Sequence, residues 1–66
     1  MDAQKIADRL IKLRGSRTQA EVAQAIGVTP SAYSMYENGE RIPRDEIKKR
    51  IAEYYKRTVN TIFFAD

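Results

Sequence analysis

Residues 18–38 read TQAEVAQAIGVTPSAYSMYEN, and the order of capping and helix-breaking residues in this stretch decides the fold. Thr18 followed by Glu21 is a capping box: the threonine hydroxyl accepts from the Glu21 amide, and the glutamate carboxylate reaches back to the Thr18 amide. Gly27 is expected to end this helix in a left-handed conformation, because glycine has no side chain to clash there. The stretch therefore begins with a helix of about eight residues, which needs its neighbours to hold it in water.

A second helix is expected directly after a short turn. Thr29 suits an N-cap, and Pro30 suits the first helical position, where a backbone amide has no partner to lose. This helix is predicted to stop at Asn38 and Gly39. Two short helices joined this tightly form a helix-turn-helix, whose second helix projects outward and is slim enough for a major groove roughly 12 Å wide. The face opposite its two tyrosines is small or neutral throughout (Pro30, Ser31, Ser34, Met35 and Asn38).

The flanking residues also have helical patterns. Residues 3–14 carry apolar side chains at the spacing of one buried helical stripe (Ile6, Leu10 and Leu13). A fourth helix is predicted over residues 44–57, with Ile47, Ile51 and either Tyr54 or Tyr55 inward and its basic residues outward (Lys48, Lys49, Arg50, Lys56 and Arg57). Asn60 is expected to cap a final turn that carries Ile62 and Phe63 onto the core. No segment alternates with a period of two, so the chain is predicted to be all-α.

The composition suits one small domain, expected to span residues 1–66. The chain has no cysteine and no histidine, so disulfides and thiolate metal sites are excluded and the commonest general base is missing. We therefore expect no enzyme, no metal and no cofactor. The longest apolar run, residues 62–65, is far too short to cross a bilayer. The N-terminus also lacks a signal peptide's apolar stretch, so a cytoplasmic location is predicted.

The positive charge is concentrated in the second part of the chain. The net charge of +3 arises from residues 41–66, which hold seven basic and four acidic side chains, whereas residues 1–40 hold five of each. A basic bias of this kind suits a polyanion such as nucleic acid. Solvated helix faces explain it equally well, so charge alone does not choose a partner.

Three segments carry a family resemblance: residues 18–23 (TQAEVA), 26–29 (IGVT) and 36–39 (YENG). In these segments and their spacing the chain closely resembles the phage repressor and Cro type of helix-turn-helix domain, also called the Xre family, over about residues 9–64. The resemblance implies a compact lambda-repressor-like domain of five short helices, with the helix-turn-helix at about 18–38. It also implies a homodimer on a two-fold related operator in double-stranded DNA, and a small transcriptional regulator acting as a repressor. Neither a membrane nor a small-molecule ligand is expected as a partner.

The same resemblance implies roles for individual residues. Gln19 and Asn38 match positions that contact DNA phosphate, and Arg41 and Arg44 lie in the loop that flanks the DNA backbone. Lys12 sits where the family often has an arginine that pairs with the glutamate matching Glu37, which implies a Lys12–Glu37 ion pair. The base-facing side of the recognition helix, residues 29–38, is expected to consist of Thr29, Pro30, Ser31, Ser34 and Met35.

This base-facing side lacks the long polar side chains that read guanine or adenine with two hydrogen bonds. We therefore expect modest direct readout, with DNA shape contributing the remainder. Tyr33 takes a position usually held by a branched aliphatic residue, and its hydroxyl is expected to reach the groove edge or a phosphate. The same neutral face also suits protein contact. The alternative function is therefore a protein-interaction module or antitoxin-like partner that uses this face and the Phe63–Phe64 end.

Overall fold

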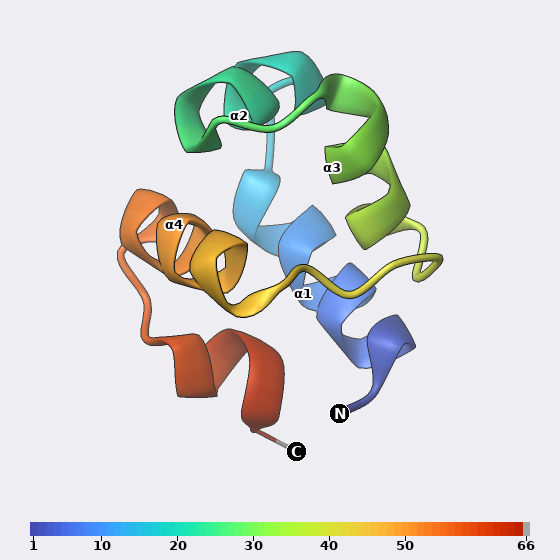
Figure 1. Cartoon of the computed structure of the whole chain (residues 1–66), viewed down its shortest axis with the longest axis vertical. Helices are drawn as coiled ribbons and strands as arrows, with labels where there is room; N and C mark the ends of the chain where they lie inside the picture. The colour runs from blue at the N-terminus through green and yellow to red at the C-terminus, as the bar shows by residue number, and fades with distance from the viewer. Residues whose placement is uncertain (66) are drawn as a thin grey trace.

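The computed structural model describes residues 1–65, which form five helical segments (Figure 1). They are α1 (Ala3–Arg14), α2 (Gln19–Ile26), α3 (Pro30–Glu37), α4 (Asp45–Tyr55) and a five-residue π-helical turn, η1 (Asn60–Phe64). No strand occurs in these residues, and the predicted all-α fold is confirmed. Within the same range, every helix is too short or too polar to cross a membrane.

The ends of α2 follow from local chemistry. The Thr18 hydroxyl accepts from the Glu21 amide at 3.0 Å, as predicted. The return bond of the capping box, from the Thr18 amide to the Glu21 carboxylate, is not formed among residues 1–65. Gly27 adopts a left-handed conformation (φ 80°), and the amides of Gly27 and Val28 both donate to the Ala23 carbonyl at 3.0 Å. This closes α2 and turns the chain at once into α3.

Helix α3 begins as the sequence predicts. The Thr29 hydroxyl accepts from the Ala32 amide at 3.0 Å, and Pro30 occupies the first turn. Its inward side chains, Tyr33 and Tyr36, are buried and meet edge to face, with ring centroids 6.2 Å apart. α3 packs against both α1 and α2, so its axis is fixed from two sides.

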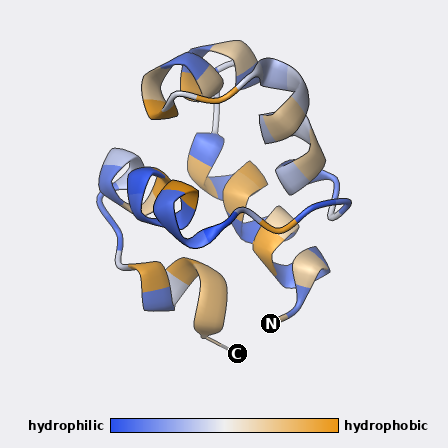
Figure 2. Ribbon diagram, viewed as in Figure 1, coloured by the Kyte–Doolittle hydropathy of each residue, from blue (hydrophilic) through white to orange (hydrophobic). Residues whose placement is uncertain are grey.

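One apolar core joins all five segments. The largest fully buried side chains include Leu10 of α1, Val22 of α2, Tyr33 of α3, Ile51 of α4 and Phe63 of η1. Replacing one such aliphatic residue with alanine leaves a cavity and costs about 2–5 kcal/mol. In Figure 2 the outer turns of α4 are largely hydrophilic, whereas the loop before α4 carries both hydrophilic and hydrophobic residues.

The buried hydroxyl of Tyr33 is bonded inside the core. It lies 2.7 Å from the hydroxyl of Tyr55 on α4, and the residue has no exposed surface. Burial and this bond raise the pKa of Tyr33, and burial raises the pKa of Tyr55. The prediction that the Tyr33 hydroxyl reaches a DNA groove edge or phosphate is therefore wrong, because its oxygen is used to join α3 to α4.

The fourth helix differs from the prediction in two ways. It runs from Asp45 to Tyr55, not from Arg44 to Arg57, because Lys56 takes a left-handed conformation (φ 57°) that ends it. Lys48, predicted to point outward, is only 7% exposed. Its ammonium lies 3.2 Å from Asp45 Oδ1 and 5.4 Å from the centre of the Phe64 ring. A lysine can bury its apolar stem while its charge finds partners at the edge of the core.

The C-terminal turn is capped differently from the prediction. Asn60 is not the cap of η1: the Thr58 hydroxyl accepts from the Thr61 amide at 3.1 Å instead. The predicted return of Ile62 and Phe63 to the core is confirmed, since both are 1% exposed. Arg9 holds the turn from α1, donating to the Ile62 carbonyl at 2.8 Å and to the Ala65 carbonyl.

Candidate nucleic-acid interface

The outward side of α3 collects the five residues predicted to face bases. Thr29, Pro30 and Ser31 are exposed, and Ser34 and Met35 are half-buried further along the helix. Asn38, exposed at the C-cap, places its amide nitrogen 3.5 Å from the Ser34 hydroxyl. Thr29, Pro30, Ser31, Ser34 and Met35 therefore form one continuous, uncharged strip along the outward side of α3. The opposite side of the helix packs against the rest of the protein.

Helix α3 is held by a buried polar network at Glu37. The Arg14 guanidinium donates to both carboxylate oxygens, with Nε 2.7 Å from Oε2 and Nη2 3.1 Å from Oε1. Gln19 Nε2 donates to the same Oε1 at 2.9 Å. The Glu37 side chain is 2% exposed and that of Arg14 22%. One carboxylate thus joins α1, the start of α2 and the end of α3.

These contacts decide the charge state of Glu37. Burial by itself would raise the pKa of the carboxyl, but the hydrogen bonds from Arg14 and Gln19 outweigh burial and bring the pKa below its ordinary value. The bond to Glu37 raises the pKa of Arg14 in turn. Both groups stay charged near neutral pH, and the paired, two-pronged geometry fixes the position of α3.

The predicted Lys12–Glu37 ion pair is wrong, because Arg14 takes the place assigned to Lys12. Lys12 is exposed and points away from the stripe formed by Ile6 and Leu10. Arg14 stands four residues after Leu10 and so continues that inward stripe to the end of α1. The four-residue spacing from Leu10 to Arg14 would have predicted an inward Arg14. The family resemblance assigned the role to Lys12 instead.

Gln19 is half-buried, and its bond to Glu37 limits what its side chain can do. A primary amide has two N–H donors. One is used by Glu37, so the other and the carbonyl oxygen remain for an outside partner. Gln19 can therefore still make the predicted contact with a phosphate. Its hydrogen bond to Glu37, which is paired with Arg14, fixes the orientation of the amide.

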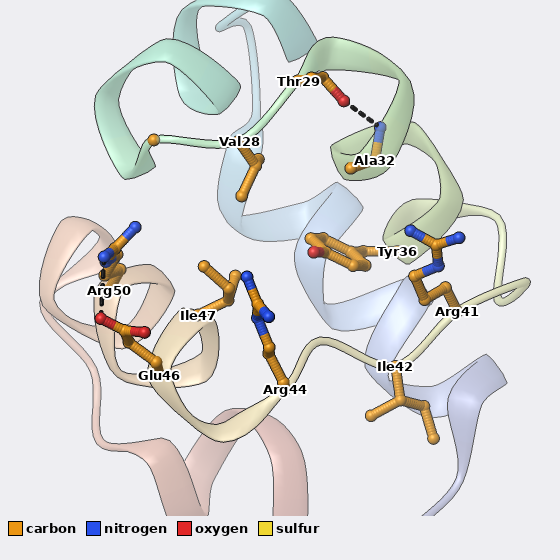
Figure 3. A pocket seen from close by; sticks show the side chains of 11 residues that line it. Val28, Thr29, Ala32, Tyr36, Arg41, Ile42, Arg44, Glu46, Ile47 and Arg50 are labelled. Carbon is orange, nitrogen blue, oxygen red and sulfur yellow. Dashed lines mark hydrogen bonds and ion pairs between the residues drawn. The ribbon is translucent and has the colours of Figure 1, made fainter.

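Arg41 and Arg44 lie apart from Gln19, on the loop that leads from α3 to α4. Both are exposed, and neither guanidinium forms an ion pair within residues 1–65. They border a groove of about 620 Å³ between the turn before α3 and the start of α4 (Figure 3). Thr29 also lines this groove, so it opens beside the N-terminal end of the strip on α3.

Arg50 is a contributor to this region that sequence reasoning missed, having been assigned only to the outward face of α4. Its Nη2 lies 2.9 Å from Glu46 Oε1, and its Nη1 lies 3.4 Å from the Ile26 carbonyl oxygen at the end of α2. A cation at that end complements the helix dipole. The arginine thereby connects α4 to the turn that precedes α3.

Among known protein families, one described as helix-turn-helix matches residues 9–62, most of the chain. No significant match was found among curated proteins or among solved structures. The matched range includes α2, α3 and the loop with Arg41 and Arg44, and it ends inside η1.

Proposed function

Because the chain belongs to the helix-turn-helix family of the Xre and Cro type, we propose that it reads a particular sequence of double-stranded DNA and represses transcription there. Membership implies DNA binding and transcriptional regulation, and the family is not a catalytic one. The observation that carries the proposal is the uncharged strip on α3, exposed or half-exposed along its length while Glu37 is locked to α1 and α2 behind it.

In the proposed complex the strip faces base edges in the major groove. The serine hydroxyls of Ser31 and Ser34 can donate or accept, and Pro30 and Met35 offer apolar contact to thymine methyl groups. Thr29 keeps its hydroxyl proton free, since the oxygen only accepts from Ala32. Each good base contact contributes about 1–3 kcal/mol of discrimination, and DNA shape supplies specificity beyond these few contacts.

Phosphate contacts flank this strip in the proposed complex. Gln19 and Asn38 contact one stretch of backbone from the ends of α2 and α3, and Arg41 and Arg44 contact backbone from the loop. Phosphate contacts orient the protein and give affinity for any sequence, with a steep dependence on salt because bound cations are released.

We propose that two copies bind together. Helix α3 has eight residues, a length of about 12 Å, which covers only a few base pairs. Two half-sites one helical turn apart, about 34 Å between centres, would supply the remaining specificity. Phe64 is 53% exposed at the end of η1 and is the apolar side chain we assign to the contact between copies, whereas Phe63 is buried in the core and unable to serve.

The test is selection of duplexes from a random pool, followed by fluorescence anisotropy on the enriched and scrambled sequences at two salt concentrations. The proposal predicts enrichment of a two-fold related sequence, two chains per duplex, and affinity that falls steeply with salt. Equal, salt-insensitive binding to both pools would reject sequence-specific recognition and favour the protein-interaction alternative.

A further inference from the structure

The groove beside α3 contains a hydroxyl that has no partner in the protein. Of the four tyrosine hydroxyls in residues 1–65, those of Tyr33 and Tyr55 bond to each other, and that of Tyr36 bonds to nothing. Tyr36 is 5% exposed and lines the groove. No fully buried side-chain oxygen or nitrogen in the described range lacks a partner, so the Tyr36 hydroxyl opens into the groove.

Two arginines line the groove together with Tyr36. In Figure 3 the Tyr36 ring lies between Arg41 and Arg44, with the hydroxyl end toward Arg44 and Ile47. Glu46 is the acidic residue that lines the groove, and it is already paired with Arg50 at 2.9 Å. Asp45, next to Arg44, is paired with Lys48 at 3.2 Å. The charge left without a partner in the groove is therefore that of Arg41 and Arg44.

The rest of the groove selects among anions. A hydroxyl donor in a groove lined by two guanidinium groups, both unpaired within residues 1–65, fits a group with several charged oxygen atoms, and arginine pairs with phosphate through two parallel N–H bonds. The groove floor is partly apolar, formed by Val28, Ala32 and Ile47. Sugar carbons on either side of a backbone phosphate match such a floor, and Thr29 at the groove edge continues directly into the strip on α3.

We propose that Tyr36, Arg41 and Arg44 form a phosphate-binding site, and that a backbone phosphate of bound DNA occupies it. The identity of the ligand rests on the proposed function. Within residues 1–65 the structure itself shows the free hydroxyl, the two unpaired arginines and the pairing of Asp45 and Glu46 with other cations. Tyr36 is thereby a DNA contact as well as a core residue. Its hydroxyl donates to a phosphate oxygen, while its ring packs against Tyr33.

The test is Tyr36→Phe, which removes one oxygen atom and keeps the ring. A hydrogen bond to a charged group predicts a loss of about tenfold in affinity for every duplex, selected or scrambled. Because the hydroxyl is neutral, the salt dependence should not change. Tyr54→Phe is the matched control: its ring is half-buried, its hydroxyl is also unpaired within residues 1–65, and it does not line the groove. This control should bind as the unmodified protein does.

A second arm uses inorganic phosphate as the probe. Amide resonances of residues 44–46 are followed by NMR during titration with sodium phosphate, against sodium chloride of equal ionic strength. Saturable shifts in the unmodified chain that disappear in Tyr36→Phe support the site. If they occur while DNA affinity is unchanged by Tyr36→Phe, the site binds free phosphate, and its assignment to a backbone phosphate of DNA is overturned.

Two results separate the failure of this site from that of the proposed function. Tight, salt-steep DNA binding with no effect of Tyr36→Phe in either arm overturns the site and leaves DNA recognition intact. Absence of DNA binding by the unmodified protein rejects the proposed function, and the phosphate titration then supports or overturns the site without DNA.

Discussion

The two sides of α3 are built from opposite kinds of residues. The inner side carries a buried carboxylate with three hydrogen bonds from two other helices, and a tyrosine hydroxyl bonded to α4. The outer side carries short or apolar side chains whose polar atoms are largely free. The inner side positions the helix, and its hydrogen-bonded polar groups are buried away from any outside partner. Apart from Thr29, whose hydroxyl caps α3, the outer side chains make few hydrogen bonds within the protein, as the proposed base-reading surface requires.

The largest expected effect comes from breaking the inner side. Glu37→Ala leaves Arg14 and Gln19 without their shared acceptor, and removal of one partner of a buried ion pair costs about 3 kcal/mol. We expect a loss of that size in the free energy of unfolding, measured by urea denaturation, and weaker binding to every duplex. A change below about 0.5 kcal/mol would show that the network does not hold α3.

Acid should weaken the same network more gently. The pKa of Glu37 in the folded chain lies below its ordinary value of 4.5, and unfolding restores that value. Protonation therefore favours the unfolded chain: the contribution to stability is complete above pH 4.5 and is lost as the pH falls through the lower folded pKa. Glu37→Gln should flatten this part of the curve of unfolding free energy against pH.

Asp2 provides the control for the acid experiment. Hydrogen bonds from the Lys5 and Gln4 amides also lower the pKa of its carboxyl, but it is fully exposed at the start of α1. Asp2→Asn should leave most of the acid dependence in place. If Asp2→Asn flattens the curve and Glu37→Gln does not, the assignment to the inner network is wrong.

The loop beside the outer side should affect DNA affinity without affecting stability. Arg44→Ala is expected to weaken binding to selected and scrambled duplexes alike and to reduce the slope of log K against log salt by about 0.9, because one phosphate contact is lost. Anisotropy titrations at several salt concentrations measure this slope. Arg57→Ala makes the same charge change beyond the end of α4 and should leave the slope nearly unchanged. Equal slopes for both variants would contradict a phosphate contact at Arg44.

The smallest effect is expected at Lys12. It is exposed and has no ion pair within residues 1–65, so Lys12→Ala should change the free energy of unfolding by less than about 0.5 kcal/mol. Arg14→Ala, by contrast, leaves Glu37 buried without its charge partner. Parallel urea titrations of the two variants test the reassignment directly, and a larger loss for Lys12→Ala would reverse it.

The ends of the two helices in the helix-turn-helix could be predicted from nearby residues. Thr18, Gly27 and Thr29 mark helix ends through bonds to atoms at most four residues away, and their roles in the structure match the prediction. The uncharged side of α3 followed likewise from helical spacing.

The errors in tertiary contacts concern side chains whose partners are distant in the sequence, whereas the Asn60 cap and the C-terminal end of α4 are errors in local structure. Arg14 meets Glu37 across 23 residues, and the Tyr33 hydroxyl meets Tyr55 across 22. Lys48 is buried, and its ammonium lies beside the ring of Phe64 in η1. Helical periodicity tells which way such a residue points, and only the packing of the helices tells what it meets. The Tyr36 hydroxyl could not be assigned from the sequence for the same reason, since its groove forms between the α2–α3 turn, α3 and the start of α4.

We propose that the outer side of α3 reads bases, while the inner side only positions the helix. The most direct measurement is the ratio of affinities for the selected and scrambled duplexes, at one salt concentration, for the unmodified protein and for Ser34→Ala combined with Met35→Ala. We predict that the ratio falls about tenfold or more, with affinity for scrambled DNA and the unfolding free energy nearly unchanged. An unchanged ratio would contradict base reading by this side of α3.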